Sequence, residues 1–425
     1  MSARSVSFLL VAALGAAQLT GWPVVDRLAL ALLGLLISAW LWSRLSLGGV
    51  GVMRAVATDR AQVGQVLTEQ VEVHNHGRLA KLWIEVIDYS TLPDHAVSRA
   101  VHVRGRRTIS WQVETLCTRR GRFRLGPAAV RSGDPLGLFT RRRTVPDARE
   151  LVVYPAEVAL NGFVPPAGVL SGGQAIDRRN PFVTPSVSGV RDYTPGDPFG
   201  RISWAATARL GRVMVKEFDL DPTADVWLVL DLHRDGHVHA ARPPRVATGP
   251  GGVSPAEAWL DATEEYAVTV VASLSRWFLD HGRNVGLICS GAHYQVTAPE
   301  RSTRQQLRLI ETLAVVRADG DRPLAEVLLS EGRRFSRQAS LVVVTPSTDE
   351  TWVSALAEIA GRHVHTTAIV VEPETFNRAP SSLMVVSDLL ATGIPTYLIK
   401  YEAGISASLA TMHGSVAASS RAHHG

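Results

Sequence analysis

The chain has 425 residues, a formal net charge of +5 and an isoelectric point near 9.5. This length exceeds what one ordinary hydrophobic core supports, so we expect roughly two or three domains. The charge excess is small, and no recognition helix, aromatic stacking platform or dense lysine stripe accompanies the arginines, so nucleic acid is not an expected partner. Cys117 and Cys289 lie far apart, which excludes a disulfide framework and a cysteine-based zinc site.

Residues 1–48 carry two apolar runs, Val6 to Trp22 and Leu28 to Trp42, joined by Pro23 to Arg27. Each run is slightly shorter than the ~20 residues that span a bilayer, and flanking residues can complete the span. We therefore predict a transmembrane α-hairpin that anchors the chain in membrane lipid. The alternative is a cleaved signal peptide, because Arg4 followed by a short apolar stretch has that pattern.

The positive charges that flank the two runs predict the orientation of the hairpin. Arg4 precedes the first run, Arg44 and Arg54 follow the second, and Asp26 and Arg27 between the runs cancel. Since positive residues favour the cytoplasmic side, we expect a two-span cell-membrane protein whose soluble domains face the cytoplasm.

Residues 49–160 contain short apolar stretches punctuated by glycine, without a helical period. This pattern predicts an antiparallel β-sandwich. The expected strands are Val66 to Val73, Leu82 to Ile87, Val97 to Val103, Thr108 to Val113, Gly121 to Leu125 and Leu151 to Tyr154.

This region is also rich in basic residues. The arginines are Arg119, Arg120, Arg122, Arg124, Arg131 and Arg141 to Arg143. We interpret them as a solvated strand face, with contact to anionic lipid headgroups as the alternative. The histidines His74, His76, His95 and His102 lack carboxylate partners at fixed sequence spacing, so we expect them at the surface or in turns.

Residues 161–188 are rich in glycine, proline, serine and asparagine and are predicted to form a linker. A signature loop follows from Gly189, in which Pro195-Gly196-Asp197-Pro198 is expected to cap a short helix that carries Ile202 and Trp204. The candidate site residues of this loop are Arg191, Asp192, Tyr193, Gly196, Asp197, Arg201, Trp204 and Arg209.

The charged members of the signature loop are expected to form one network, with Tyr193 and Trp204 packed beneath it. Such ion pairs commonly fix loop geometry. Because neither a nucleophile with its base nor a pair of unneutralised carboxylates is visible, we assign the loop a structural or interaction role and no catalytic residue.

From Asp225 onward, apolar strands alternate with helical patterns, which predicts a doubly wound, mainly parallel α/β sheet of the Rossmann type. The expected strands are Val226 to Leu230, Asn284 to Ser290, Ser340 to Thr345, Val364 to Val371 and Thr396 to Tyr401. Ligands of such sheets bind beyond the carboxyl ends of the strands, which should bring Asp231, Ser290 and Thr345 to Asp349 together. This domain and the signature loop occupy residues 189–402, and the tail 403–425 is predicted to be disordered.

The segment from Gly189 to Phe218 resembles the signature of the domain-of-unknown-function family 58 (DUF58). Companion motifs occur at Thr118 to Pro127, Ser132 to Phe139 and Val152 to Pro155, so the resemblance covers nearly the whole chain. One difference is that Gly200-Arg201 stands where the family usually has two arginines. The resemblance implies a C-terminal domain similar to a von Willebrand factor A module.

A metal-ion-dependent adhesion site of that module has the pattern Asp-x-Ser-x-Ser, whose oxygens suit Mg²⁺. Here the matching residues are Asp231, His233 and Asp235, so the chain departs from the standard set. A transition metal could suit these ligands, and the competing interpretation is a strand-end Asp231 that holds backbone amides of the loop. We therefore expect no resident cofactor.

The resemblance also implies a partnership with a MoxR-type AAA+ ATPase, in which the α/β domain grips an unidentified client protein. No GxxxxGK[ST] phosphate loop occurs in the sequence, so ATP hydrolysis would belong to another chain. We thus predict a membrane-anchored interaction protein that is not an enzyme. The alternatives are an envelope-facing adhesion or scaffold protein and a metal-dependent hydrolase at Asp231.

Overall fold

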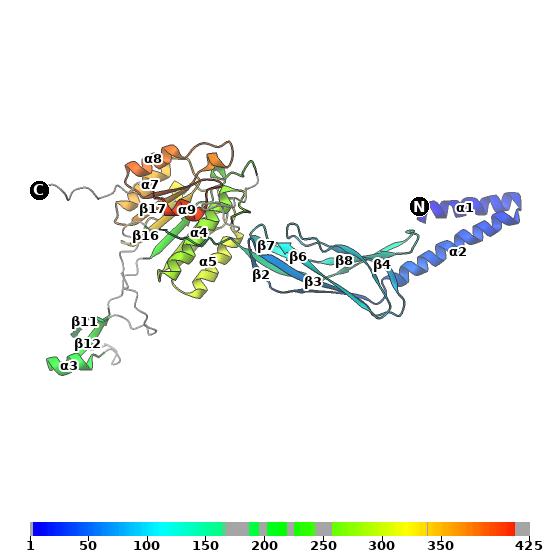
Figure 1. The fold of residues 1–425 in the computed structure, drawn as a ribbon, viewed down its shortest axis with the longest axis horizontal. Coiled ribbons are helices and arrows are strands. Elements are labelled where there is room, and N and C mark those ends of the chain that lie inside the picture. The colour runs from blue at the N-terminus through cyan, green and yellow to red at the C-terminus, as the bar shows by residue number, and fades with distance from the viewer. Residues whose placement is uncertain are drawn as a thin grey trace. The chain divides into compact units, whose positions relative to one another are not determined.

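A computed structural model describes residues 3–163, 165, 187–194, 202–218, 225–242, 257–337 and 339–412. The chain forms two compact units, Met1–Pro155 and Ala156–Gly425 (Figure 1). Residues 156–163, which the sequence predicts at the end of the sandwich and the start of the linker, belong to the second unit. The reason is packing, since the buried ring of Phe163 makes an edge contact with Trp277, 5.1 Å between centroids.

The chain begins with two apolar helices, α1 (Ala3–Thr20) and α2 (Pro23–Ser46). Gly21 has φ +63°, a conformation that suits glycine, and Pro23 starts α2 with a preset φ. Among the described residues, α2 alone is long and apolar enough to cross a membrane, and most of its surface is exposed. This single candidate indicates a membrane anchor or a signal sequence, because a signal sequence near the N-terminus has the same properties.

The rest of the first unit is built from β-strands. They are β1 (Val50–Val56), β2 (Arg60–Gln62), β3 (Val66–Asn75), β4 (Lys81–Asp88), β5 (Arg99–Val103), β6 (Thr108–Leu116), β7 (Gly121–Leu125), β8 (Ala128–Gly133), β9 (Thr140–Val145) and β10 (Arg149–Tyr154). They form sheets of order β1-β3-β6, β5-β4-β8-β9 and β2-β10-β7, and all pairs are antiparallel except β2 with β10.

Apolar side chains of the first two sheets meet in a shared core. Val73 of β3, Ile84 and Val86 of β4 and Val130 of β8 are fully buried there. Buried and half-exposed positions alternate along β3, as expected for a strand with one face on a core. This packing forms the β-sandwich that the alternating pattern predicts.

Two expectations about polar residues of the sandwich are wrong. The side chain of His95 is only 1% exposed, because carboxylates from neighbouring strands, which sequence spacing does not reveal, surround it. Arg120 is likewise fully buried and is no part of a solvated face.

The second unit contains a six-stranded sheet of order β15-β14-β13-β16-β17-β18. Its strands are β13 (Val226–Leu230), β14 (Val285–Ser290), β15 (Tyr294–Glu300), β16 (Ser340–Thr345), β17 (His365–Val371) and β18 (Thr396–Ile399). Its helices are α4 (Thr263–Asp280), α5 (Thr303–Val315), α6 (Leu324–Glu331), α7 (Thr351–Ala360), α8 (Leu383–Ala391) and α9 (Ile405–Ala410), with short 3₁₀ turns η2 (Arg234–Gly236) and η3 (Pro373–Thr375). Only β15, which the sequence does not predict, is antiparallel to its neighbour.

Both faces of this sheet are buried, which explains the continuous apolar strands. Leu228 and Leu230 pack with α4, α5 and α9, whereas Trp227 and Val229 pack with α6, α7 and α8. The expectation of a disordered tail from residue 403 is wrong for α9, since Ile405 and Leu409 are fully buried in the core with α4. Residues 413–425 lie outside the described part of the chain.

A separate element of the second unit consists of β11 (Val187–Asp192), α3 (Trp204–Leu210) and β12 (Met214–Phe218). The two strands pair antiparallel, so β11 begins within the predicted linker, most of which lies outside the described residues. Ser203 is the N-cap of α3, and Gly211 ends it with φ +69°. Ile202 therefore precedes the helix, where it forms a bridge with Val215, and is not carried on it as predicted.

Candidate functional site

The β11–α3–β12 element places the described part of the signature loop. The pairing sets Asp192 opposite Met214, and the N–H of Tyr193 donates to the carbonyl of Val213 over 3.0 Å. The Asp192 carboxylate pairs with Arg212 at 3.1 Å. Sequence reasoning missed Arg212, and the signal for it is the antiparallel pairing, which brings the chain after α3 back beside β11.

The structure describes only some residues of the predicted charged network. The backbone of Arg191 lies in β11, and Arg209 is exposed near the end of α3, whereas Gly196, Asp197 and Arg201 lie outside the described residues. Trp204 is 70% exposed, so it is not packed beneath a charged network as predicted.

The element also exposes further apolar side chains. Leu210 at the end of α3 is 51% exposed, and Val213 just before β12 is 43% exposed. Together with Trp204 we call these residues the α3 apolar surface. Large apolar side chains that a small folded element exposes are candidates for contact with another protein.

The second predicted site lies at the carboxyl edge of the six-stranded sheet. Asp231, directly after β13, is 1% exposed, and one of its oxygens accepts a bond from the hydroxyl of Thr345 over 2.6 Å. Its other oxygen accepts the backbone N–H of His233 at 3.0 Å. The hydroxyl of Ser290 accepts the N–H of Leu232 at 3.1 Å. The parallel strands therefore bring Asp231, Ser290 and Thr345 together, as the sequence predicts.

The loop after Asp231 is held by hydrogen bonds and an ion pair. The imidazole of His237 lies 3.0 Å from the carbonyl of Asp231 and 3.2 Å from the hydroxyl of Thr263, the first residue of α4. The guanidinium of Arg234 pairs with Asp321 and donates to the carbonyl of Asp319 over 3.2 Å. Arg234 and Asp321 were not singled out from the sequence, because their pairing joins two loops that lie far apart along the chain.

The three candidate metal ligands do not converge on one point. Asp231 is buried with both oxygens bonded, Asp235 has an 81% exposed side chain, and 3.8 Å separates the Nε2 of His233 from the Asp235 carboxylate. Within the described residues, no group of three or more His, Cys, Asp or Glu side chains could hold a metal ion. The arrangement does match the competing interpretation, in which Asp231 holds the backbone of its loop.

Comparison with known proteins bears on the signature loop. The family described as "Protein of unknown function DUF58" matches residues 189–243. The chain is 27% identical over 274 residues to "Uncharacterized protein YeaD" of Bacillus subtilis, an alignment that covers 63% of this chain and 61% of YeaD. These matches support the DUF58 family. The DUF58 match contains both the α3 apolar surface and Asp231, so the two candidate sites lie in one family segment.

Further similarities cover less of the chain. "Uncharacterized protein Rv1480" of Mycobacterium tuberculosis is 25% identical over 190 residues, covering 43% of this chain and 54% of Rv1480. The chain thus spans less than two thirds of these DUF58-related proteins. Among solved structures, the CARDB domain of the PF1109 protein from Pyrococcus furiosus is 13% identical, with 24% of this chain and 91% of that domain covered and a TM-score of 0.19.

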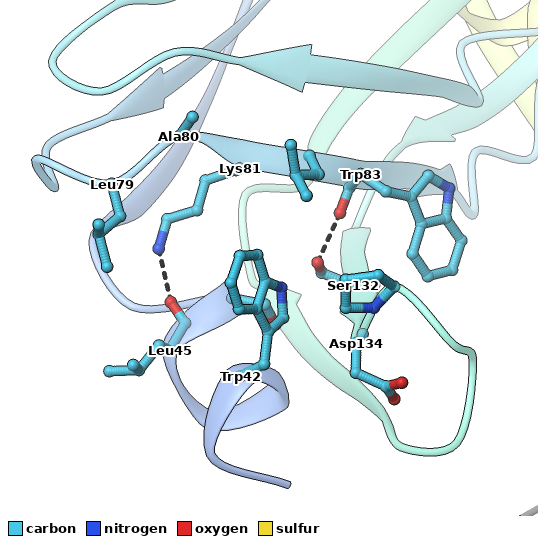
Figure 2. A pocket seen from close by; sticks show the side chains of 12 residues that line it. Trp42, Leu45, Leu79, Ala80, Lys81, Trp83, Ser132 and Asp134 are labelled. Atoms are coloured by element: carbon cyan, nitrogen blue, oxygen red, sulfur yellow. Dashed lines mark hydrogen bonds between the residues drawn. The ribbon is translucent and has the colours of Figure 1, made fainter. Parts of the chain in front are cut away.

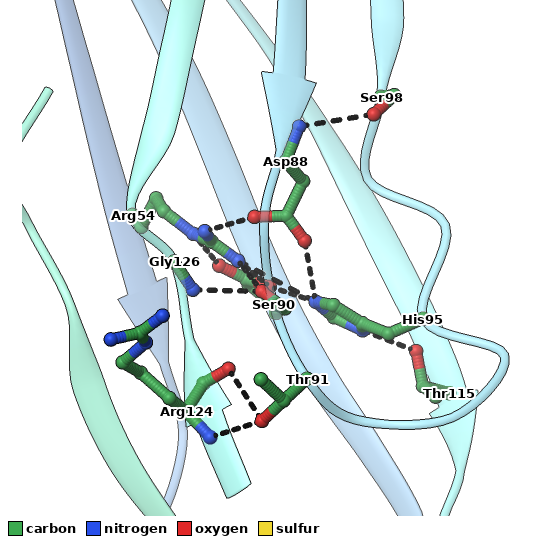
Figure 3. Close-up of polar contacts among 10 residues, drawn as sticks. Arg54, Asp88, Ser90, Thr91, His95, Ser98, Thr115, Arg124 and Gly126 are labelled. Carbon is green, nitrogen blue, oxygen red and sulfur yellow. Dashed lines mark hydrogen bonds and ion pairs between the residues drawn. The ribbon is translucent and has the colours of Figure 1, made fainter. Parts of the chain in front are cut away.

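A buried charge cluster in the sandwich was missed by sequence reasoning (Figure 3). The guanidinium of Arg54 on β1 pairs with Glu69 on β3, which is fully buried, and with Asp88 on β4 at 2.6 Å. The Nε2 of His95 lies 2.9 Å from the Glu69 carboxylate, and its Nδ1 lies 2.7 Å from the hydroxyl of Thr115. These residues come from five separate segments, so only the fold brings them together.

The cluster controls the charge of Glu69. Burial opposes ionisation of this carboxyl, but hydrogen bonds from His95 and Arg54 outweigh burial and lower the pKa of Glu69 to about 2. Because each carboxylate in the cluster faces a cationic or hydrogen-bonding partner, no general base results. We therefore interpret the cluster as a clamp between β1, β3 and β4.

Proposed function

We propose that this chain is a membrane-anchored protein-interaction module without catalytic activity of its own. The observation that carries the proposal is the α3 apolar surface, in which Trp204, Leu210 and Val213 are exposed within the DUF58 match. Tryptophan is enriched at positions that dominate binding energy, because its ring buries a large area with few rotatable bonds.

The α/β unit is proposed to resemble a von Willebrand factor A module. This is supported by the strand order, which in chain order reads 3-2-1-4-5-6, with the third strand antiparallel. The non-enzymatic role is supported by Asp231, whose two carboxylate oxygens are committed to Thr345 and to the loop backbone. A carboxylate held in this way positions loops instead of abstracting a proton.

Anchoring is proposed to use α1 and α2 as two spans, with both soluble regions in the cytoplasm. The apolar side chains exposed around α2 support insertion into lipid, because a helix that is apolar on all sides lacks a water-compatible face. A MoxR-type AAA+ ATPase is the proposed partner, which rests on the family resemblance. The client protein would be gripped by the α/β unit.

Binding of a purified MoxR-type ATPase to the full-length chain in detergent tests this proposal. We expect the double variant Trp204→Ala/Leu210→Ala to weaken binding at least tenfold, since truncation of hot-spot residues typically costs about 2 kcal/mol or more. The matched control is Trp259→Ala/Leu329→Ala, which truncates an exposed tryptophan and an exposed leucine elsewhere in the same unit.

Equal binding by the native chain and both double variants would exclude the α3 apolar surface as the contact. Absence of binding by the native chain would exclude this partner. A reporter fused to the C-terminus distinguishes the alternatives, because activity in the cytoplasm supports the ATPase partnership and activity outside supports an envelope-facing scaffold.

A further inference from the structure

The end of the sandwich next to α2 gathers residues from distant parts of the chain. β1 starts at Val50, four residues after α2 ends, and Val50 pairs with Asn75 at the end of β3. Lys81 at the start of β4 pairs with Val103, and Gly133 pairs with Thr140 in the β8–β9 hairpin. We call this the α2 end of the sandwich.

The last turn of α2 is fixed to this end by polar contacts. The buried Lys81 donates from its ammonium group to the carbonyl of Leu45, in the last turn of α2, over 2.5 Å (Figure 2). The N–H of His76 donates to the carbonyl of Gly49 over 2.7 Å. The sandwich thus begins directly at the terminus of the candidate membrane helix.

The α2 end carries several exposed positive charges. The N–H of Arg106 donates to Gly77 over 2.9 Å, so the β5–β6 turn lies against the β3–β4 turn. The exposed arginines of these turns and of the last turn of α2 are Arg44, Arg78, Arg104, Arg106 and Arg107. Among the described residues, no ion pair neutralises Arg78, Arg104, Arg106 or Arg107.

A cavity of about 280 Å³ opens between the last turn of α2 and the sandwich (Figure 2). Its walls are mainly apolar and include Trp42, Leu45, Leu82 and Trp83, which are all exposed. The acid in its lining, Asp134, is buried and accepts the backbone N–H groups of the β8–β9 turn. The cavity therefore offers apolar surface without an exposed negative charge.

We propose that the α2 end of the sandwich binds an anionic phospholipid of the leaflet that α2 enters. The arginines would hold the phosphate, and the cavity would take the glycerol end of the acyl chains. The proposal rests on the membrane anchoring proposed above. Continuity with α2 favours lipid over a protein partner, since the cavity wall is the last turn of a helix that is apolar enough to cross a bilayer.

The combination of charge and aromatic rings also matches the interfacial layer of a membrane. Tryptophan favours the headgroup level, and basic residues near an anionic leaflet are each attracted to it.

The strand register shows which of the basic sandwich residues lie near the proposed lipid site. Arg141 lies near the α2 end, because it pairs with Ser132, whereas Arg124 lies at the opposite end, where its carbonyl accepts from Thr91.

Fluorescence quenching of the full-length chain in vesicles tests the proposal. The chain is reconstituted into phosphatidylcholine vesicles that contain either brominated phosphatidylglycerol or brominated phosphatidylcholine, and tryptophan emission is recorded. We expect stronger quenching by the anionic lipid, with part of the difference lost in Trp83→Phe. The preference for the anionic over the zwitterionic lipid should fall several-fold in Arg78→Gln/Arg106→Gln. The upper limit is about 30-fold, because each arginine near the membrane contributes about 1 kcal/mol.

The matched control is Arg122→Gln/Arg124→Gln, which removes the same charge from exposed positions of β7. Retained preference in the Arg78/Arg106 variant, equal loss in both variants, or no preference in the native chain would overturn the proposal and leave anchoring intact. Flotation of the same vesicles reports on anchoring separately. A native chain that fails to float would overturn both.

Discussion

Arg54 and Glu69 lie on neighbouring strands, and both are buried with their charges in direct contact. Taking two charges out of water is costly, and the additional contacts of Arg54 with Asp88 and of Glu69 with His95 offset that cost. Removing one member therefore leaves an uncompensated buried charge. The cluster should make the sandwich sensitive both to mutation and to acid.

The depressed pKa of Glu69 predicts acid sensitivity of the first unit. The folded-state value of about 2 lies below the ordinary value of about 4.3, so ionised Glu69 stabilises the fold above pH ~4.3. That contribution, about 3 kcal/mol, is lost as pH falls from ~4.3 toward ~2. Urea unfolding of the native chain in detergent between pH 5 and 2 measures it.

The control for this prediction is the variant Glu69→Gln, which cannot titrate at this position. It should be destabilised at pH 5 by about 3–5 kcal/mol and should lose less stability on acidification than the native chain. Glu114→Gln, at an exposed position of β6, should follow the native curve. Parallel pH curves for the native chain and Glu69→Gln would contradict the assignment.

The pattern of apolar residues along the chain predicts most of the strands and helices whose faces are buried. The continuous apolar run Val226–Leu230 predicts a strand buried on both faces, and β13 is central in its sheet. β15 was missed because it lies at the edge of the described sheet, beside β14, so its pattern is partly exposed. α9 was missed because Ser, Ala and Gly dominate that segment, and two apolar residues suffice to pack it.

Other features were missed because the sequence does not show which strands of the sandwich are neighbours. The contact of Asp231 with Thr345 was predictable, because parallel strands end at one edge of the sheet. The contact of Arg54 with Asp88 was not, because it depends on which strands lie together in two sheets. The packing of Trp204 was predicted wrongly because the charged residues of the loop do not show which side chains a helix of seven residues covers.

The burial of α9 predicts that this helix contributes to the stability of the α/β unit. Leu409→Ala removes a fully buried side chain from the core with α4, so we expect a loss of about 2–5 kcal/mol in the free energy of unfolding. Chemical denaturation followed by circular dichroism measures the loss. Lys400→Ala, at an exposed position just after β18, should change stability by less than about 0.5 kcal/mol. Equal stability of the two variants would show that α9 does not pack as described.

The whole molecule combines apolar N-terminal helices, a sandwich that starts at the end of α2 and an α/β unit with an exposed apolar surface in the DUF58 match. Each proposed role depends on α2 remaining part of the mature chain. A cleaved signal sequence would remove α2 and with it one wall of the cavity at the α2 end.

The most direct test of this account is the intact mass of the chain recovered from carbonate-washed membranes. We predict that the chain stays in the membrane pellet and that its mass includes α1 and α2. A chain released by carbonate, or a membrane-bound chain whose mass shows that it begins after Ser46, would contradict the account.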